Sequence, residues 1–332
     1  MSDVVHTERA PPRAYPAHLT FDDLVAANKR KSALLMVVMV LLLVAVGAAI
    51  AALVAQGGDP RPTLLLGAGA SFVVALGACA WSFYGGDKTI LGLVDARELE
   101  KADDPQLFNV VEELSIAAGL PMPRVHLIDD DALNAFATGR DPEHASVAIT
   151  RGLRERLSRD ELAGVMAHEL SHVRHYDVRF AMLMVTLVGL VVIASDATWR
   201  VLRLGALRSR SSRSSRGGGS AVQLVVLAVA LVLLVVAPLL AAVIRFAMSR
   251  EREYLADAGA VELTRYPQGL IGALEKLGAD HRPLAGAHQA TSHLFIVNPL
   301  KSAARAEGHS RSSAFATHPS LQDRIARLQA LT

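Results

Sequence analysis

A His-Glu-x-x-His pattern at residues 168–172 is the clearest chemical feature of this chain. Histidines four positions apart lie about one turn apart on one face of a helix, so both imidazole rings can reach one zinc ion. Glu169 follows the first histidine and leans to the same side. Its carboxylate can accept a proton from a metal-activated water and pass it to a leaving amine. The pattern therefore predicts a hydrolytic site with one Zn²⁺ per chain, held by His168 and His172.

The residues around this pattern indicate that it lies on a helix. Ser158 and Glu161 have the spacing of a capping box, in which each side chain bonds the other residue's backbone N–H. Apolar residues then recur at helical spacing, at Leu162, Val165, Met166, Leu170 and Val173. The spacing predicts an amphipathic helix that carries both histidines.

Zinc in a peptidase needs a third protein ligand and keeps a fourth position open for water. The single cysteine, Cys79, lies in an apolar run, which excludes cysteine-rich zinc sites. Val178 stands where a His-Glu-x-x-His-x-x-Gly-x-x-His site would have its third histidine, so the ligand must come from another helix. The best candidate is the segment 249–258, where Glu253 and Asp257 can supply a ligand and a carboxylate that holds a histidine N–H. A solvated, charged turn at a membrane boundary is the alternative interpretation.

The composition limits the classes of protein to which this chain can belong. Its 332 residues are enough for one sizeable domain plus membrane segments. Hydrophobic residues make up 52% and the mean hydropathy is +0.32, values that are high for a soluble enzyme and indicate contact with a bilayer. The formal net charge of +2 argues against a nucleic-acid partner.

Residues 32–86 are predicted to form a transmembrane hairpin. The runs 32–55 and 63–84 carry no charged side chain, and each is long enough to span the hydrocarbon core as a helix. The preceding residues 1–31 are polar and contain prolines, and we interpret them as a flexible cytoplasmic tail. This tail ends in three basic residues at 29–31, so the positive-inside rule places both ends of the hairpin in the cytoplasm.

Residues 87–178 are predicted to form the first half of a catalytic domain. A helix is predicted at residues 104–119, where an Asp-Pro pair marks the start and a glycine marks the end. Residues 124–128 and 146–150 have the composition of short strands.

The segment 134–139 lies between these two strands. A strand placed just before a metal-binding helix can pair with an extended peptide and present it to the metal. Asn134, Ala135 and Phe136 are accordingly candidates for substrate binding. An internal sheet strand without substrate contact is the alternative, and the sequence alone does not favour either.

Residues 179–248 are predicted to form a second hydrophobic hairpin around an Arg/Ser/Gly-rich loop at 200–220. Two crossings of the bilayer would place that loop outside the cytoplasm, against the positive-inside rule, whereas no crossing would require both apolar runs to be buried as a hairpin. An odd number would separate the histidines from a third ligand in residues 249–332, the second half of the catalytic domain. We favour two crossings, because the uncharged run 221–244 is costly to keep out of lipid.

Four motifs in this order resemble those of the HtpX-type membrane zinc metalloproteases, which are relatives of the eukaryotic prenyl-protein (CAAX) endoprotease. They are Asn-Ala-Phe-Ala-Thr-Gly at 134–139, His-Glu-Leu-Ser-His at 168–172, Glu-Tyr-Leu-Ala-Asp-Ala at 253–258, and Thr-His-Pro at 317–319 followed by Arg324 and Ile325. The resemblance implies that Glu253 is the third zinc ligand, that Asp257 supports the site and that Glu169 is the general base.

The resemblance also implies a multi-pass protein of the inner membrane with a catalytic domain that faces the cytoplasm. Its implied role is protein quality control, in which a zinc endopeptidase hydrolyses misfolded or membrane proteins. The expected partners are polypeptide substrates and the lipid bilayer.

His318 precedes a proline and a short predicted helix near the end of the chain. Its imidazole is a candidate for stabilising the tetrahedral oxyanion, and a structural role at the helix start is the alternative. Arg324 on the same helix could pair with a carboxylate of the site.

Together these features predict a mostly α membrane protein with a zincin-like α+β catalytic domain, a small antiparallel sheet and about four transmembrane helices. The predicted reaction is zinc-dependent peptide-bond hydrolysis. The alternative is a latent or inactive zinc-binding membrane protein with a regulatory or chaperone-like role. The intact Glu169 argues against an inactive protein. A prenyl-protein processing protease is an alternative within the enzyme class, but that branch has more membrane spans.

Overall fold

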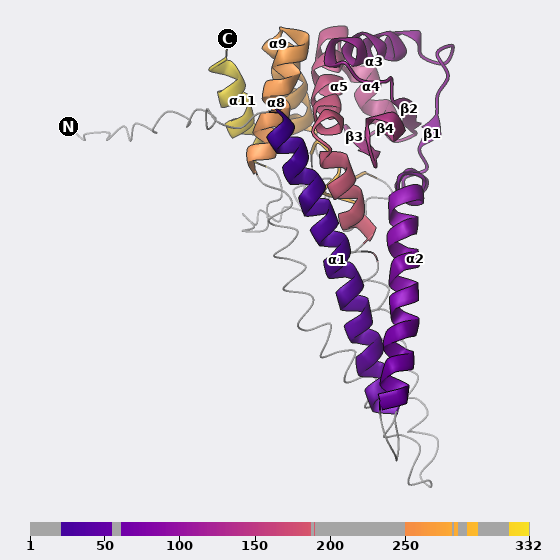
Figure 1. The fold of residues 1–332 in the computed structure, drawn as a ribbon. Helices are drawn as coiled ribbons and strands as arrows, with labels where there is room; N and C mark the ends of the chain where they lie inside the picture. The colour runs from indigo at the N-terminus through magenta and orange to yellow at the C-terminus, as the bar shows by residue number, and fades with distance from the viewer. Residues whose placement is uncertain are drawn as a thin grey trace, which may run out of the picture.

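The computed structural model describes residues 21–54, 61–186, 189, 250–280, 282–284, 291–297 and 319–331. In Figure 1, two long helices, α1 (Phe21–Val54) and α2 (Arg61–Leu93), run together away from a head that holds the other labelled elements. The predicted hairpin at residues 32–86 falls on these two helices. The Arg/Ser/Gly-rich loop, most of the second predicted hairpin and His318 lie outside the described residues.

α1 begins well before the predicted start of the first span. Residues 21–31 are helical, so the prediction of a flexible tail is wrong for this part, whereas residues 1–20 lie outside the described residues. The physical reason is a contact with the head. Asn28 is buried, and its amide bonds residues 175 and 177, which no local composition argument can detect.

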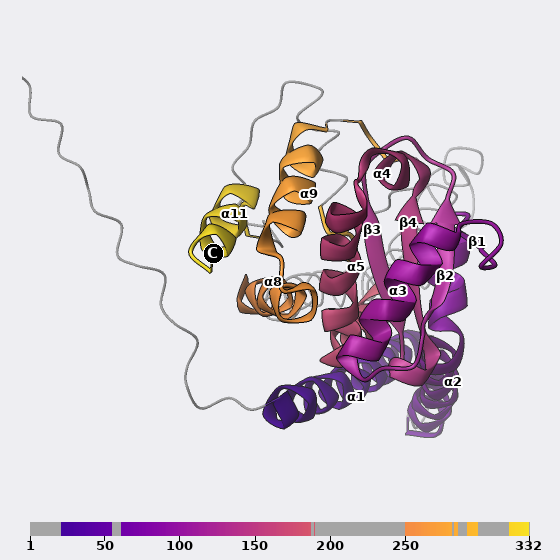
Figure 2. The same cartoon turned by 90° about the horizontal axis from the view of Figure 1, so that it is seen from above.

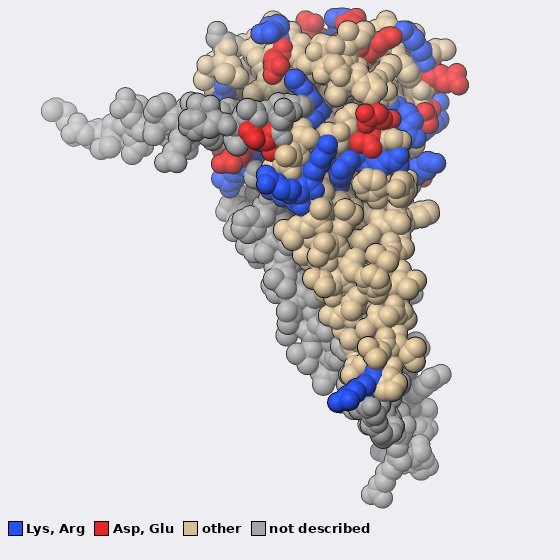
Figure 3. Space-filling model, in the orientation of Figure 1, with Lys and Arg blue, Asp and Glu red and all other residues tan. Residues whose placement is uncertain are grey.

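Within the described part of the chain, α2 is the one helix that is long and apolar enough to cross a membrane by length and composition. The mean hydropathy of its most apolar stretch is 2.0, and only 11% of that stretch is buried. Large side chains such as Leu65, Leu66 and Trp81 therefore face outward. Figure 3 shows the result as a column beneath a charged head, with basic atoms in its described part only near the lower end. A contiguous apolar surface of this size marks contact with lipid or with another protein.

Small residues allow α1 and α2 to approach each other closely. A Cβ atom added at Gly47 of α1 would lie 1.6 Å from the Ser71 Oγ atom of α2. One added at Gly67 of α2 would lie 2.3 Å from the Ala51 Cβ atom of α1. Close packing at small residues is typical of helices that associate in lipid, where the hydrophobic effect does not drive helices together.

The head contains a four-stranded sheet in the order β1-β2-β4-β3. Its strands are β1 (Arg97–Glu98), β2 (Arg124–Ile128), β3 (Ala135–Gly139) and β4 (Ala145–Thr150). Antiparallel pairs join β1 to β2 and β3 to β4, but β2 and β4 are parallel. The prediction of an antiparallel sheet is therefore wrong, and the sheet is mixed. The cause is the β3–β4 hairpin, which inserts the fully buried β4 beside β2 and leaves β3 at the edge.

The helices of the head include α3 (Pro105–Ala118), α4 (Arg151–Arg156), α5 (Arg159–Arg174), α8 (Arg250–Thr264), α9 (Pro267–Ala279) and α11 (Leu321–Gln329). The predicted ends of α3 are confirmed: Asp104 accepts a hydrogen bond from the Leu107 N–H, and Gly119 ends the helix with a φ of 66°. Ser158 and Glu161 form the predicted capping box of α5.

α5 lies at the centre of the head. Figure 2 shows it between the sheet, where β3 is its neighbour, and the helices α8 and α9. A Cβ atom added at Gly164 of α5 would lie 2.6 Å from the Leu270 backbone nitrogen of α9. One added at Gly259 of α8 would lie 2.3 Å from the Ser171 Oγ atom of α5. These close approaches fix α5, which carries both histidines, against the helix that carries Glu253.

Replacing Gly164 with alanine tests whether this close packing holds α5 in place. The new methyl group would press on the Leu270 backbone, so we expect the free energy of unfolding to fall by about 1–3 kcal/mol. Thermal unfolding of the detergent-purified protein would show the loss as a lower Tm. The control is Gly92→Ala in α2, where an added Cβ atom meets nothing within 4 Å and Tm should not fall. An unchanged Tm in Gly164→Ala would show that α9 is free to shift.

Candidate metal centre

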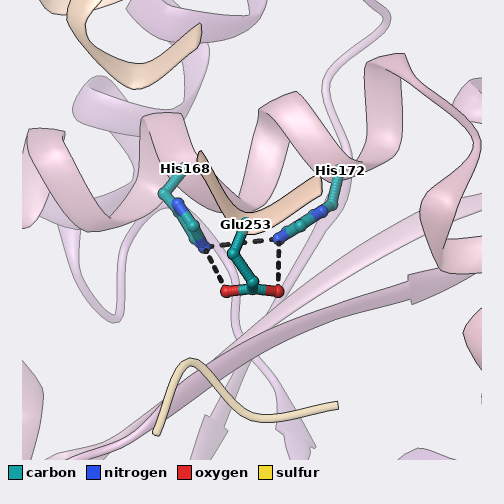
Figure 4. A group of neighbouring side chains, drawn as sticks. All are labelled: His168, His172 and Glu253. Carbon is teal, nitrogen blue, oxygen red and sulfur yellow. Dashed lines mark hydrogen bonds and ion pairs between the residues drawn. The ribbon is translucent and has the colours of Figure 1, made fainter. Parts of the chain in front are cut away.

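The structure brings together His168 and His172 of α5 and Glu253 of α8, as Figure 4 shows. The two Nε2 atoms lie 3.3 Å apart, and each lies 3.8 Å from one carboxylate oxygen of Glu253. All three predicted ligands therefore direct their donor atoms at one spot. The His168 side chain is 1% exposed, whereas those of His172 and Glu253 are 16% and 12% exposed. Solvent therefore reaches this spot past His172 and Glu253.

Each histidine ring is held by a carboxylate on its other nitrogen. His168 Nδ1 lies 3.0 Å from Asp257 Oδ1, and His172 Nδ1 lies 3.0 Å from Asp177 Oδ2. An ionised carboxylate can only accept, so each Nδ1 carries a hydrogen and each Nε2 of a neutral ring presents its lone pair to the shared spot. The two Nε2 atoms lie only 3.3 Å apart, so either a proton or a metal cation must lie between them.

This donor set fits a zinc ion. Ligand atoms about 2.0–2.2 Å from a tetrahedral zinc lie roughly 3.3–3.6 Å from one another. The two Nε2 atoms are 3.3 Å apart and each is 3.8 Å from a different Glu253 oxygen, while one ligand atom from each residue lies within 4.8 Å of the others, so a small movement of the Glu253 side chain would complete this arrangement. Two imidazoles and one carboxylate, with a fourth position left for water, form a ligand set of catalytic zinc. Among the described residues, this is the one group of histidine and carboxylate side chains close enough together to hold a metal ion.

Asp177 is a site residue that the sequence analysis missed. It follows His172 by 5 positions, beyond the end of α5, and Tyr176 with a φ of 61° turns the chain between them. The signal that could have found it is chemical. A metal-binding histidine needs an acceptor for its second N–H, and Asp257 serves only one of the two rings.

Glu169 lies beside the metal ligands and is 2% exposed. Burial, together with the nearby Glu253, raises the pKa of its carboxyl group to about 7, although His172 and the Ala137 N–H act in the opposite direction. A pKa near neutrality suits a group that must both accept and return a proton. Because Ala137 belongs to β3, its hydrogen bond also turns the Glu169 carboxylate toward the edge strand.

The two histidines have opposite pKa shifts. Burial and the adjacent Arg324 lower the pKa of His168 to about 4, so its ring is neutral and able to bind a metal. Burial acts the same way on His172, but Asp177 and Glu253 outweigh it and raise the pKa of that ring to about 9. A metal cation would be attracted by the same two carboxylates, so its binding would displace this proton.

Arg324 of α11 is fully buried beside the site. Its Nη2 and Nε atoms donate to the Asp257 carboxylate at 2.6 and 2.9 Å, which confirms the prediction that this arginine pairs with a site carboxylate. A third bond runs from Nη1 to the Ile296 carbonyl at 3.3 Å. Burial alone would raise the pKa of Asp257, but Arg324 and His168 hold it below its usual value. Asp257 is therefore ionised and able to hold the His168 ring.

The candidate substrate-binding residues lie at one end of β3, where segment 295–297 covers the edge of the sheet. The Ile296 N–H donates to the Ala135 carbonyl at 3.0 Å. The Asn134 side-chain amide donates to the Val297 carbonyl at 2.9 Å. The Phe136 ring packs edge-on against the phenylalanine of the segment, with centroids 5.1 Å apart. All three residues thus make internal contacts, and residues 137–139 form the rest of the edge.

The chain matches the model of peptidase family M48 over residues 101–332. It is 40% identical over 310 residues to the "Protease HtpX homolog" of Dictyoglomus thermophilum, which covers 93% of this chain and 94% of the relative. The protein of the same name from Syntrophobacter fumaroxidans is 44% identical over 264 residues, or 79% of this chain and 88% of the relative. The crystal structure of S. mikatae Ste24p matches with a TM-score of 0.45 and 18% identity, over 92% of this chain and 67% of that one.

Removing the charge of Arg324 tests whether the site depends on it. Arg324→Leu would leave the Asp257 carboxylate buried without its main cation, so we expect the free energy of unfolding to fall by about 3–5 kcal/mol. A displaced Asp257 would also release the His168 ring, so zinc affinity should fall as well. Thermal unfolding and competition with a zinc chelator measure the two effects.

The matched control is Arg327→Leu on the same helix. Arg327 is partly exposed and lies 3.7 Å above the Tyr254 ring, so its loss should cost about 0.5–1 kcal/mol and leave zinc affinity unchanged. Equal losses in the two variants would contradict the role assigned to Arg324.

Proposed function

This chain belongs to peptidase family M48, and on that premise we propose that it is a zinc-dependent endopeptidase embedded in a membrane. The observation that carries the proposal is the convergence of His168, His172 and Glu253 on one spot, with the Glu169 carboxylate beside it. Two imidazole rings and a carboxylate would hold one zinc ion and leave one coordination position for water.

The proposed reaction divides its tasks among these residues. Zinc, when bound, polarises the scissile carbonyl and makes water a stronger nucleophile at neutral pH. Glu169 accepts the proton that water loses as its oxygen bonds to the carbonyl carbon. It then gives that proton to the amide nitrogen as the C–N bond breaks. Asp257 and Asp177 keep the His168 and His172 rings in the tautomer that leaves both Nε2 atoms able to bind the metal.

The peptide is proposed to lie along the edge of β3. β3 is an edge strand, and the Ala137 N–H on that edge bonds the Glu169 carboxylate. An extended peptide added there would place its scissile bond near the base and the metal ligands. Residues 137–139 would pair with the peptide directly. Asn134, Ala135 and Phe136 would act together with segment 295–297, which covers them.

His318 is proposed to stabilise the oxyanion of the tetrahedral intermediate through its imidazole. The support is its place in the sequence, three positions before α11. α11 reaches the site through Arg324, whose guanidinium is 3.8 Å from the Glu253 carboxylate.

The membrane part of the proposal depends on α1 and α2. The outward-facing apolar side chains of α2 would face lipid, and α1 has three exposed basic residues, Lys29, Arg30 and Lys31, at its head end. The positive-inside rule would then place the head on the cytoplasmic side of the inner membrane. With a second hairpin that crosses twice, about four helices would span the bilayer. Substrates would be misfolded or membrane polypeptides, as in protein quality control.

A latent enzyme is the second candidate. The observation in its favour is segment 295–297, which already pairs with the Ala135 end of β3 and would compete with an extended peptide there. Glu169 argues against a permanently inactive protein, since the carboxylate that hydrolysis requires is present and lies near His172 and Glu253.

Glu169→Gln is the direct test of the proposed reaction. The amide keeps the shape of the side chain but cannot accept a proton, so cleavage of an unfolded reporter protein should fall at least about 10²–10⁴-fold. Zinc content, measured on the same detergent-purified samples, should stay at one ion per chain, because Glu169 is not a ligand. Addition of a chelator to the wild-type protein should abolish cleavage, and zinc should restore it.

Glu155→Gln is the matched control, because Glu155 lies on the surface of α4 with a side chain that is 63% exposed. It should cleave the reporter at the wild-type rate. Equal cleavage by Glu169→Gln and Glu155→Gln would contradict the proposed role of Glu169. Zinc in every sample with cleavage in none would favour the latent enzyme.

A further inference from the structure

Asn28 links the first long helix to a zinc ligand. The residue is 4% exposed although it lies on α1, far from α5 in the sequence. Its Nδ2 atom donates to Asp177 Oδ1 and to the His175 carbonyl, each at 2.8 Å. The other carboxylate oxygen of Asp177 holds His172 Nδ1 at 3.0 Å. The connection from α1 to the metal centre therefore passes through only one intervening side chain.

The geometry of this contact restricts how Asp177 can turn. A side-chain amide has two N–H hydrogens, and Asn28 uses one on the carboxylate and one on the backbone at the end of α5. Arg252 of α8 donates to the same Oδ1 atom at 3.2 Å. With Oδ1 bound from two sides, Oδ2 is directed at the His172 ring. The amide thus ties the carboxylate to the helix whose histidine it supports.

A second contact fastens the same turn of α1 to the head. The Lys29 ammonium lies 4.4 Å from the centroid of the Tyr176 ring, and the Arg179 guanidinium lies 4.9 Å from it. Tyr176 is the residue between the two acceptors of the Asn28 amide and has a φ of 61°. Asn28 and Lys29, which are adjacent on α1, therefore both contact the turn that brings Asp177 close to His172.

From these contacts we propose that Asn28 is a positioning residue of the metal centre, which makes α1 a structural part of the active site. Asn28 acts by fixing the Asp177 carboxylate, which in turn fixes the His172 ring. Residues that orient a ligand from outside the metal's own ligand set change metal affinity or activity when they are replaced. A change in the position of α1 would therefore alter the support of the His172 ring. This inference rests on the zinc site of the proposed function and not on its peptidase activity.

The test compares full-length, detergent-purified variants of Asn28. Asn28→Leu has a similar volume but no donor, so zinc affinity from chelator competition should fall about tenfold, the lower end of the range for such supporting residues. The absorption spectrum of the Co²⁺-loaded protein should also shift, because the His172 ring is no longer held in one orientation. The control is Ser32→Ala, one turn further along α1, where a buried hydroxyl is removed without touching Asp177.

A double-mutant cycle separates positioning from general destabilisation. If Asn28 acts through Asp177, the double variant Asn28→Leu/Asp177→Asn should bind zinc no more weakly than Asp177→Asn alone. Additive losses, or an Asn28→Leu affinity and cobalt spectrum equal to those of Ser32→Ala, would overturn the inference. Asn28→Ala supports the same comparison if Asn28→Leu does not fold. A wild-type chain that binds zinc but hydrolyses no polypeptide would overturn the proposed function and leave this inference standing.

Discussion

The head depends on charged side chains and histidines that are buried together. His168, Glu169, Asp177, Asp257 and Arg324 are each at most 7% exposed. A buried charge is tolerated only where an opposite charge or a hydrogen-bond partner lies within reach. These groups find their partners across several elements, so α5, α8, α11 and the turn after α5 depend on one another to satisfy their buried charges. The metal centre is therefore the point at which separate parts of the chain become one fold.

Small side chains on α5 make this assembly sterically feasible. Gly164, Ala167 and Ser171 recur at helical spacing, and α9 approaches closely at Gly164 and α8 at Ser171. A larger residue along this stripe would move α8 outward and carry Glu253 away from the two histidine nitrogens. Another face of α5 carries bulky apolar residues, Leu162, Val165, Met166, Leu170 and Val173, that belong to the core. Ligand geometry and helix packing are thus set by the same few positions.

The features that could be predicted from the sequence are those encoded by neighbouring residues. The capping box of α5, the Asp104 cap and Gly119 end of α3, and the strands at 124–128 and 146–150 all follow from local patterns. The parallel pairing of β2 with β4 could not be predicted, because it depends on where the β3–β4 hairpin docks. Asp177 and the helical start of α1 also escaped prediction, since each is specified by a contact between residues distant in the sequence.

The position of the metal centre bears on what can reach it. Asn28, one turn before the predicted start of the first span at Ser32, already touches the carboxylate behind His172. Under the proposed topology, the site therefore lies close to the membrane surface. A polypeptide emerging from the bilayer could reach β3 in an extended form, whereas a folded soluble protein would first have to fit between the head and the lipid. Under the proposed function, this geometry would select extended chains near the membrane through access rather than through side-chain recognition.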